Sequence, residues 1–536
     1  MKRTIITTAV ALWAVALAAL LFWVRRGHEP GPLRAVTIPL EGDLQTLDPA
    51  ALSDPTTSRV VWQMYEGLVG LDAMNNVVPM LAQSWDSQDG GRIWVFHLRE
   101  GVLFHPHPAF TGETQTRAVN AADVVWSIQR LARGFGSFVF GGLVEGFDGY
   151  VKGEAGSVRG LKVTGADEVA FTLMRPDPSF LYRLTSPYLS IMPREVVEAK
   201  PDEFGRSVAI GTGPFRLVRA GTTEVELERN PKYWQATEGN IARITFKVEK
   251  NPQLRASGLK TGVYDLLALP TELRREYLDR KGLLKPDWSA RFRVFESKTY
   301  NVHLLAMDAT QLTDGALRRA ISLAIDRKEI ADELLFGGAV PAKSPVPPGL
   351  RGYESPLPVV TDQAAARREL ANSSYDGREL SFLVADVPDH PDVAQVVQAD
   401  LLKCGIRTRI EQVDFNAFVA RLFGSERPQL FLTYSEWIYS APDLLMDQFR
   451  STATPNPNVF GYADERVDSL IARLGATSDR AELNRLCSRI ESTVAEAPPA
   501  AWLYHRTHAY IATRRLSNFA VTGNNHWLLS ELRGEP

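Results

Sequence analysis

Two cysteines among 536 residues are too few for a fold held together by disulfide bonds. Cys404 and Cys487 each fall on the apolar face of a predicted helix, so we expect two buried thiols, although an oxidising compartment would also permit a bridge. Charge of either sign is not in excess, because 60 Lys and Arg residues balance 63 Asp and Glu residues. The formal net charge of -3 argues against nucleic acid or an anionic membrane as a partner.

Local catalytic motifs are also missing. The chain has no Gly-x-Ser-x-Gly elbow, phosphate-binding loop, His-Glu-x-x-His helix or Cys-x-x-Cys pair, which argues against the commonest hydrolase and kinase mechanisms. His105 and His107 share one face of an extended segment, but a metal would need further ligands, so we expect solvated imidazoles here and at His505 and His508. The glycine-rich segment 134–149 lacks lysine and predicts a flexible surface loop.

Long apolar runs are missing too, except at the start of the chain. Ile5–Val24 is flanked by the basic residues Lys2, Arg3, Arg25 and Arg26. Its length of about 20 residues would span a bilayer as a helix and predicts export. The run could be cut as a signal peptide, but we favour an uncleaved anchor. Everything after it is expected on one side of the membrane, in the periplasm.

The length of the chain exceeds what one hydrophobic core can hold, so at least two lobes are expected. Apolar residues at helical spacing predict helices over 121–131, 315–336, 390–403, 465–474 and 479–496. An alternating strand at Ile406–Ile410 follows the third helix, which is a unit of α/β architecture. The basic pair Arg318 and Arg319 is expected to lie on a solvated helix face.

Four segments carry a recognisable pattern in order along the chain. Gly211–Leu217 and Asn230–Trp234 predict a glycine-cornered strand pair closed by an aromatic turn, and Ala320–Arg327 and Phe460–Leu470 follow on predicted helices. In this order and spacing they resemble the extracytoplasmic solute-binding proteins of peptide and nickel ABC importers, family 5. The resemblance extends over nearly the whole exported part.

The resemblance implies an α/β fold, namely a bilobal periplasmic-binding-protein clamp, class II-like, with an extra inserted subdomain and one preceding N-terminal apolar helix. The implied segments are 1–30 for the signal or anchor and linker, 33–62 with 206–297 and 512–536 for lobe I, 63–205 for the inserted subdomain, and 298–511 for lobe II.

The same resemblance implies a carrier rather than a catalyst. Such a protein binds a peptide or similar small polar solute between its lobes, closes about a hinge and delivers the solute to a membrane permease. Closure requires that the ligand contact both lobes more favourably in the closed state than in the open one. We expect a monomer that needs no cofactor and no metal.

A cluster of aromatic and polar residues follows the strand-like segment Gln429–Leu432, where a strand opens into a loop. Aromatic rings there would offer broad apolar contact with a polar edge. The alternative is a core corner around a buried Trp437. The predicted ligand contacts are Tyr434, Glu436, Trp437 and Tyr439 from one lobe and Asp48, Tyr65 and Glu66 from the other.

One position departs from the family pattern. In peptide-binding relatives an aspartate four residues before a proline holds the α-amino group of the ligand. Counting back from Pro442 gives Ile438, which cannot accept that hydrogen bond. Glu436 or Asp443 could take its place, or the ligand could be a blocked peptide, an oligosaccharide or a metal chelate. A membrane-tethered sensor and a hydrolase with carboxylates in the cleft are the competing classes.

Overall fold

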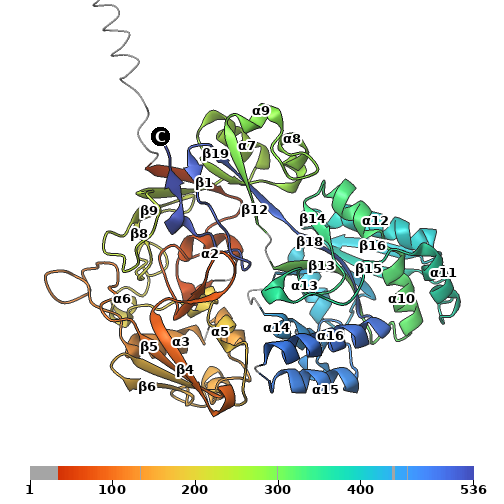
Figure 1. Ribbon diagram of the computed structural model, residues 1–536, viewed down its shortest axis with the longest axis horizontal. Helices are drawn as coiled ribbons and strands as arrows, with labels where there is room; N and C mark the ends of the chain where they lie inside the picture. Colours follow the sequence, from red (N-terminus) through yellow and green to blue (C-terminus); the bar gives the residue numbers. More distant parts are fainter. Residues whose placement is uncertain are drawn as a thin grey trace, which may run out of the picture.

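The protein forms two bodies that lie side by side and are joined by long strands (Figure 1). This computed structural model describes residues 34–52, 54–132, 134–297, 300–436, 441–454, 457–477 and 479–536. The predicted N-terminal apolar helix lies outside these ranges. Within them, no helix combines the length and the apolar character needed to cross a membrane.

The first body begins with a four-stranded sheet in the order β1-β10-β9-β8, in which β1 and β10 are parallel. A three-stranded sheet in the order β11-β19-β12 lies beside it. The strands are β1 (Ala35–Leu40), β8 (Phe215–Ala220), β9 (Glu224–Arg229), β10 (Arg243–Val248), β11 (Leu266–Ala268), β12 (Phe292–Ser297) and β19 (His508–Thr513). The helices are α2 (Pro55–Val61), α7 (Pro252–Thr261), α8 (Arg274–Tyr277) and α9 (Pro286–Ser289).

The expected strand pair after Gly211 is confirmed as β8 and β9. Gly211 and Gly213 pack directly on the backbone of Met64, at the end of the turn after α2. A Cβ atom at either glycine would collide with that backbone, so the corner needs residues without side chains.

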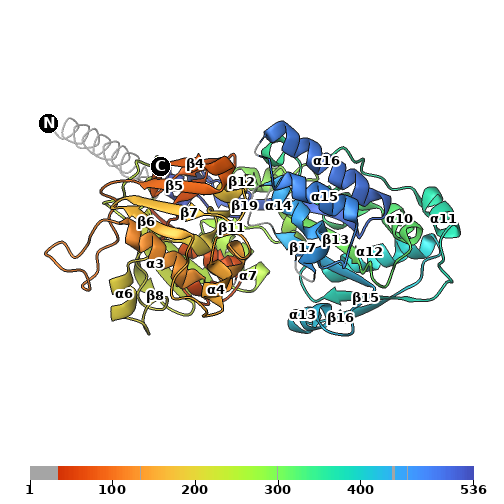
Figure 2. The same cartoon turned by 90° about the horizontal axis from the view of Figure 1, so that it is seen from below.

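An inserted subdomain lies below this lobe in the view of Figure 1 and contains a four-stranded sheet in the order β4-β5-β7-β6, which Figure 2 shows from below. Its strands are β4 (Ala82–Gln88), β5 (Ile93–Leu98), β6 (Leu161–Gly165) and β7 (Glu168–Thr172), after the hairpin β2 (Val69–Leu71) and β3 (Val77–Pro79). Its helices are α3 (Ala121–Leu131), α4 (Phe147–Val151), α5 (Phe180–Arg183) and α6 (Arg194–Ala199). Asn120 and Asp123 form the capping box that starts α3 where the sequence predicted it.

The prediction of a flexible surface loop over 134–149 was wrong. Phe140 and Phe147 from this segment are buried with their ring centroids 5.6 Å apart. Phe140 also packs on Phe171 of β7 and Phe180 of α5. The glycines fit a compact, folded segment, and Phe140 and Phe147 contribute to the subdomain core.

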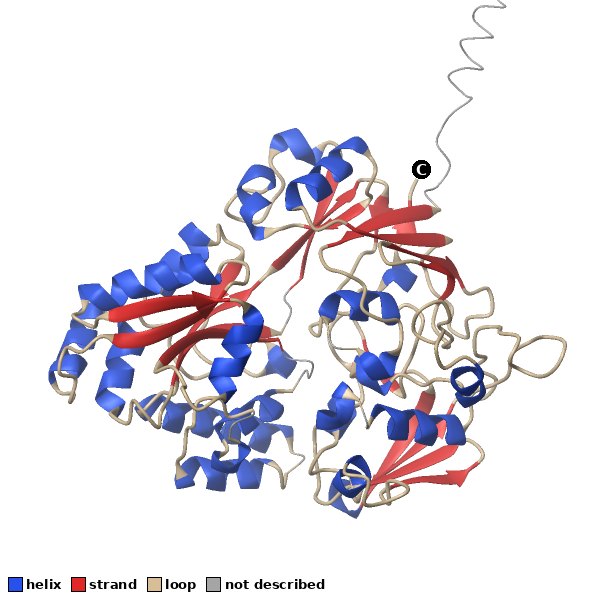
Figure 3. Cartoon of the chain, turned by 180° about the vertical axis from the view of Figure 1, so that it is seen from behind, coloured by secondary structure: helices blue, strands red, loops and turns tan. Residues whose placement is uncertain are grey.

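The second body contains a mixed six-stranded sheet in the order β14-β18-β13-β17-β15-β16. Its strands are β13 (Asn301–Met307), β14 (Ala339–Pro341), β15 (Leu380–Ala385), β16 (Thr408–Val413), β17 (Leu430–Glu436) and β18 (Ala500–Arg506). Its helices are α10 (Gly315–Ala324), α11 (Gln363–Ala371), α12 (His390–Lys403), α13 (Phe415–Phe423), α14 (Pro442–Met446), α15 (Glu465–Leu474) and α16 (Arg480–Glu496). Figure 3 shows helices on both faces of the sheet.

The alternation of β13 explains why this sheet has two cores. Every residue of β13 is buried. Leu304 and Ala306 belong to the cluster that includes residues of α15 and α16, whereas Leu305 and Met307 belong to the cluster that includes residues of α10 and α12. The sequence of a central strand with helices on both faces is therefore a continuous apolar run without alternation.

The helices predicted at 121–131, 390–403, 465–474 and 479–496 are confirmed to within one residue. The single helix predicted over 315–336 was wrong, because α10 stops at Ala324 and a short π-helix, η6 (Glu329–Leu334), follows. Ile325 is extended at the break. This lets the side chain of Arg327 turn inward and donate to the carbonyl of Trp502 on β18 at 2.6 Å.

Two predictions about side-chain exposure have opposite outcomes. The thiols of Cys404 and Cys487 are free and buried, as expected. Arg318, expected in solvent, is buried and donates to the backbone carbonyls of Leu312, Ala497 and Pro498. Its guanidinium therefore binds carbonyls just before α10 and just after α16. The charge pattern of the sequence does not predict this burial.

Candidate ligand-binding site between the lobes

The lobes are linked where strands of one sheet continue into strands of another. The chain leaves the first lobe after β12 and enters the second at β13, and it returns between β18 and β19. The Asn301 side chain joins the two passages, because it donates to the carbonyl of Arg506 at 3.1 Å and accepts from its N–H at 2.7 Å. Short linking segments of this kind are the usual hinges of domain closure. β19 begins at His508 and belongs to the sheet of the first lobe. The residues at which the sequence divides the lobes stay a prediction.

A second meeting place lies between α5 of the inserted subdomain and α14 of the second lobe (Figure 1). The hydroxyl of Ser179 donates to the carboxylate of Asp443. The guanidinium of Arg351 lies 4.4 Å from the ring centroid of Tyr182 and 3.8 Å from an oxygen of Asp443. We call these four residues the interlobe contact. Burial raises the pKa of the Asp443 carboxyl, despite its hydrogen bond with Ser179 and the nearby Arg351.

The interlobe contact is tightly packed. The cavity beside it, lined by Arg175, Arg183 and Asp447 among others, measures about 20 Å³. That is room for a water molecule rather than for a solute. A solute bound between the lobes would therefore lie elsewhere.

Tyr434 is the predicted contact that the structure describes at the end of β17. It is 38 % exposed, and its ring stacks on His303 with the centroids 5.4 Å apart and the planes at 21°. His303 in turn stacks on Tyr504, at 4.5 Å, and approaches His390 with 3.2 Å between ring nitrogens. The buried layer of His303, His390 and Tyr504 thus supports an exposed aromatic platform.

Burial sets the charge of this supporting layer. It lowers the pKa of His390 to about 4 and that of His303 well below its ordinary value. Both imidazoles are therefore neutral near pH 7, so one can donate to the other across the 3.2 Å gap.

The other contacts predicted on this lobe, Trp437 and Tyr439, lie outside the described residues, as do Ile438 and the Glu436 side chain. They stay predictions. The described chain resumes at Ala441 and turns directly into α14. The loop after β17 therefore starts at the Tyr434 platform and ends at the interlobe contact.

The three residues predicted to oppose them on the first lobe are buried, and two of them, Asp48 and Glu66, already have polar partners. Asp48 is buried and forms a two-point ion pair with Arg130, at 2.6 and 2.7 Å. Tyr65 is buried against the glycine corner, with its ring in contact range of Gly211. The roles of Asp48, Tyr65 and Glu66 in binding stay predictions, and a ligand would have to compete with these contacts.

Glu66 is 5 % exposed and ties two of the sequence motifs together. Its carboxylate accepts hydrogen bonds from the hydroxyls of Thr212, at 2.6 Å, and Tyr233, at 2.7 Å, and from the indole of Trp234, at 3.1 Å. Burial raises its pKa to about 7. The glycine corner and the aromatic turn therefore meet at this one buried carboxyl.

The expectation of solvated imidazoles was wrong for two histidines. His105 and His505 are buried, and their rings lie 2.9 Å from the carbonyl of Gly213 and 2.7 Å from that of Asn301. His105 therefore contacts the glycine corner, and His505 contacts Asn301 where the chain passes between the lobes. The described residues contain no cluster of three or more His, Cys, Asp or Glu side chains that could hold a metal ion.

Sequence reasoning missed Ser179, Tyr182 and Arg351, because they are far apart in the chain and no local motif marks them. Of the interlobe contact it singled out only Asp443, and for another role.

A model of a known family matches most of the described chain. The model of bacterial extracellular solute-binding proteins, family 5 (middle region), matches residues 76–456. The chain belongs to this family. Members are solute-binding proteins that work outside the cytoplasm.

Individual relatives extend the comparison over most of the chain. A dipeptide-binding protein of Pseudomonas aeruginosa is 25% identical over 461 residues, covering 83% of this chain and 84% of its own. Heme-binding protein A of Haemophilus influenzae is 24% identical over 455 residues, covering 82% and 80%. The Helicobacter pylori binding protein DppA, solved with the peptide STSA, superposes with a TM-score of 0.76 at 19% identity, covering 94% of this chain and 99% of that one. The expected α/β fold of bilobal periplasmic binding proteins is confirmed.

Proposed function

We propose that this protein is the extracytoplasmic binding component of an ABC importer and carries a short peptide or similar small polar solute. The observation that carries the proposal is that two lobes are linked twice, from β12 to β13 and from β18 to β19, beside an exposed aromatic platform. The chain also belongs to family 5. Relatives named for dipeptide binding support the peptide class. The solute leaves chemically unchanged, so the protein is not an enzyme.

The solute lies on Tyr434 and under the loop that follows β17. Asp443 already accepts from Ser179 and has Arg351 nearby, so Glu436 is the better candidate to hold an amino group. Trp437 and Tyr439 would flank the solute from the same loop. Asp48, Tyr65 and Glu66 are weaker candidates because all three are buried, and Asp48 and Glu66 already have internal partners.

Isothermal titration calorimetry tests this with the purified full-length chain and a pool of di- and tripeptides. Binding of free peptides, with weaker binding of their N-acetylated forms, is expected if a carboxylate holds the amine. Mass spectrometry of the recovered peptide should show it intact, whereas cleavage products would identify a hydrolase. A complete lack of binding to any peptide would reject the leading ligand class.

A second candidate is a solute without a free amine, such as a blocked peptide, an oligosaccharide or a metal chelate. Ile438 favours it, since that side chain stands at the position expected to hold an amine and offers no acceptor. A relative named for heme binding, at similar identity, shows that family members serve different solutes. Stronger binding of acetylated than of free peptides would favour this candidate.

We also propose that the protein is a monomer held at the membrane by residues 5–24, where it serves a permease or acts as a tethered sensor. Light scattering and fractionation of cells test the first two points. Uptake of the bound solute, lost when the gene is deleted, would distinguish transport from sensing.

A further inference from the structure

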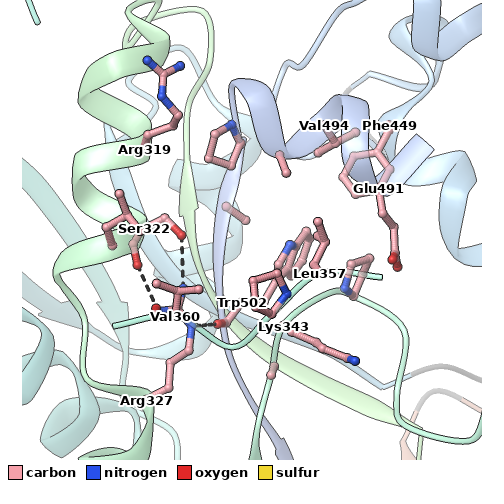
Figure 4. A pocket seen from close by; sticks show the side chains of 17 residues that line it. Arg319, Ser322, Arg327, Lys343, Leu357, Val360, Phe449, Glu491, Val494 and Trp502 are labelled. Atoms are coloured by element: carbon pink, nitrogen blue, oxygen red, sulfur yellow. Dashed lines mark hydrogen bonds between the residues drawn. The ribbon is translucent and has the colours of Figure 1, made fainter. Parts of the chain in front are cut away.

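The edge of the second lobe's sheet is incompletely paired. The edge strand β14 has three residues and pairs with β18 only over Tyr504–Arg506. The segment 342–362 leads from β14 to α11, and we call it the strap. The N–H of its first residue, Ala342, donates to the carbonyl of Leu503 on β18 at 3.0 Å. A pocket of about 200 Å³ remains between this strap, α10 and α16 (Figure 4).

The charged groups around the pocket are engaged by the protein itself. Arg327 donates to the carbonyls of Trp502, Ser322 and Val360 at 2.6, 2.9 and 3.0 Å, as the dashed lines in Figure 4 partly show. Arg319 pairs with Glu369 at 2.8 Å. Both guanidinium groups therefore hold the strap and the helices in place, and neither is available to bind a ligand.

The buried carboxylate at the pocket wall is engaged in the same way. Glu491 accepts from the hydroxyl of Tyr353 at 2.9 Å, and burial raises its pKa. The hydroxyls of Ser344 and Ser355 lie close enough to influence the same carboxyl. Lys343, which also lines the pocket, donates to the carbonyl of Ser355 at 2.8 Å. Oε1 of Glu491 has no hydrogen-bond partner but is buried away from solvent. A charged ligand would therefore lose its hydration with little to replace it.

What remains facing the space is apolar and partly aromatic. The apolar side chains that line it include those of Leu323, Pro345, Leu357, Phe449, Val494 and Trp502. A dry apolar cavity of about 150 Å³ in a protein interior can accept benzene. A pocket of about 200 Å³ with an indole and a phenyl ring in its wall therefore suits a molecule of one or two rings.

We propose that this pocket is a second ligand site, for a small uncharged aromatic molecule, held beneath the strap of the second lobe. It is distinct from the proposed solute site and from the interlobe contact, because neither Tyr434 nor any residue of that contact lines it. It requires no hinge motion, since all of its walls belong to one lobe.

Indole is the probe, and saturation-transfer NMR on the purified full-length chain is the measurement. Leu357→Trp and Ala495→Leu each place extra volume at the pocket wall, one from the strap and one from α16. Val359→Trp is the matched control, because Val359 lies on the same strap, is 46 % exposed and does not line the pocket. Circular dichroism identifies which variants fold.

Indole signals are expected with the wild type and with Val359→Trp, and are expected to be lost in each filling variant that folds. The use of two filling variants keeps the test valid if one of them misfolds. The proposal is overturned if millimolar indole gives no transfer with the wild type. Retained binding in a folded filling variant, or equal loss in Val359→Trp, would overturn it as well.

Discussion

The interlobe contact should set how far the lobes are closed before any solute binds. The perturbation is a double variant, Ser179→Ala with Arg351→Ala. The first change removes the hydroxyl that donates to Asp443, and the second removes the cation over the ring of Tyr182. Both contacts join the inserted subdomain to the second lobe, so opening breaks them while each body stays folded.

The magnitude follows from the kinds of contact. A hydrogen bond to a carboxylate contributes about 1.5 to 3 kcal/mol, and a partly exposed cation over an aromatic ring about 0.5 to 1 kcal/mol. The side chain of Arg351 is 22 % exposed and that of Asp443 is 8 % exposed, so solvent screens these contacts only in part. Water recovers some of the loss in the open state. A net change of about 2 kcal/mol shifts the ratio of closed to open forms about thirtyfold.

Small-angle X-ray scattering without ligand measures the result as the radius of gyration. The double variant should be larger than the wild type. Ser190→Ala is the control, since its hydroxyl is buried and donates to Pro187 inside the same subdomain. A double variant with the same scattering profile as this control would refute the argument that the contact holds the lobes together.

Three further predictions concern single residues. Tyr434→Ala should weaken solute binding at least tenfold by calorimetry, because it removes the exposed platform, whereas Phe423→Ala, at a 47 % exposed ring on α13, should leave affinity unchanged. Glu66→Leu should lower the free energy of unfolding by about 3 kcal/mol in urea, because it leaves Tyr233 and Trp234 without their acceptor, while Glu66→Gln should cost less. For His390, the folded pKa of about 4 lies below the unfolded value of about 6.5, so the unfolded chain binds the proton first and stability falls as pH drops below about 6.5. Between pH 6.5 and 5 this one group should cost about 1.6 kcal/mol, and His390→Gln should remove that part of the pH dependence of urea unfolding. An unchanged affinity in Tyr434→Ala, an unchanged free energy of unfolding in Glu66→Leu or an unchanged pH dependence in His390→Gln would contradict the role of that residue.

Much of the fold could be predicted because its local signals agree with its packing. The apolar stripes of α12 and α15 and the cap of α3 appear in the sequence at the same residues as in the structure. The failures came where a long-range contact overrides a local pattern. The helix predicted beyond Ala324 breaks so that Arg327 can reach β18, and Arg318 leaves solvent to bind carbonyls from the end of α16.

The candidate site could be predicted only in part. Tyr434 was identified because a strand ends there, and the end of a strand is a local feature. The interlobe contact and the buried layer under Tyr434 bring together residues that are 87 to 264 positions apart. Such pairs leave no spacing rule in the sequence, so only the folded chain reveals them.

The residues that mark the family and those that would choose the solute lie in different places. Thr212, Tyr233 and Trp234, from the two most distinctive motifs, meet at Glu66 inside the first body, where they fasten the glycine corner. The loop after β17 belongs to the other body, between the Tyr434 platform and α14. Because the motifs stabilise the scaffold without entering that loop, the loop can change its side chains while the fold stays the same. If this loop contacts the solute as we propose, one scaffold can hold different solutes without a change of fold.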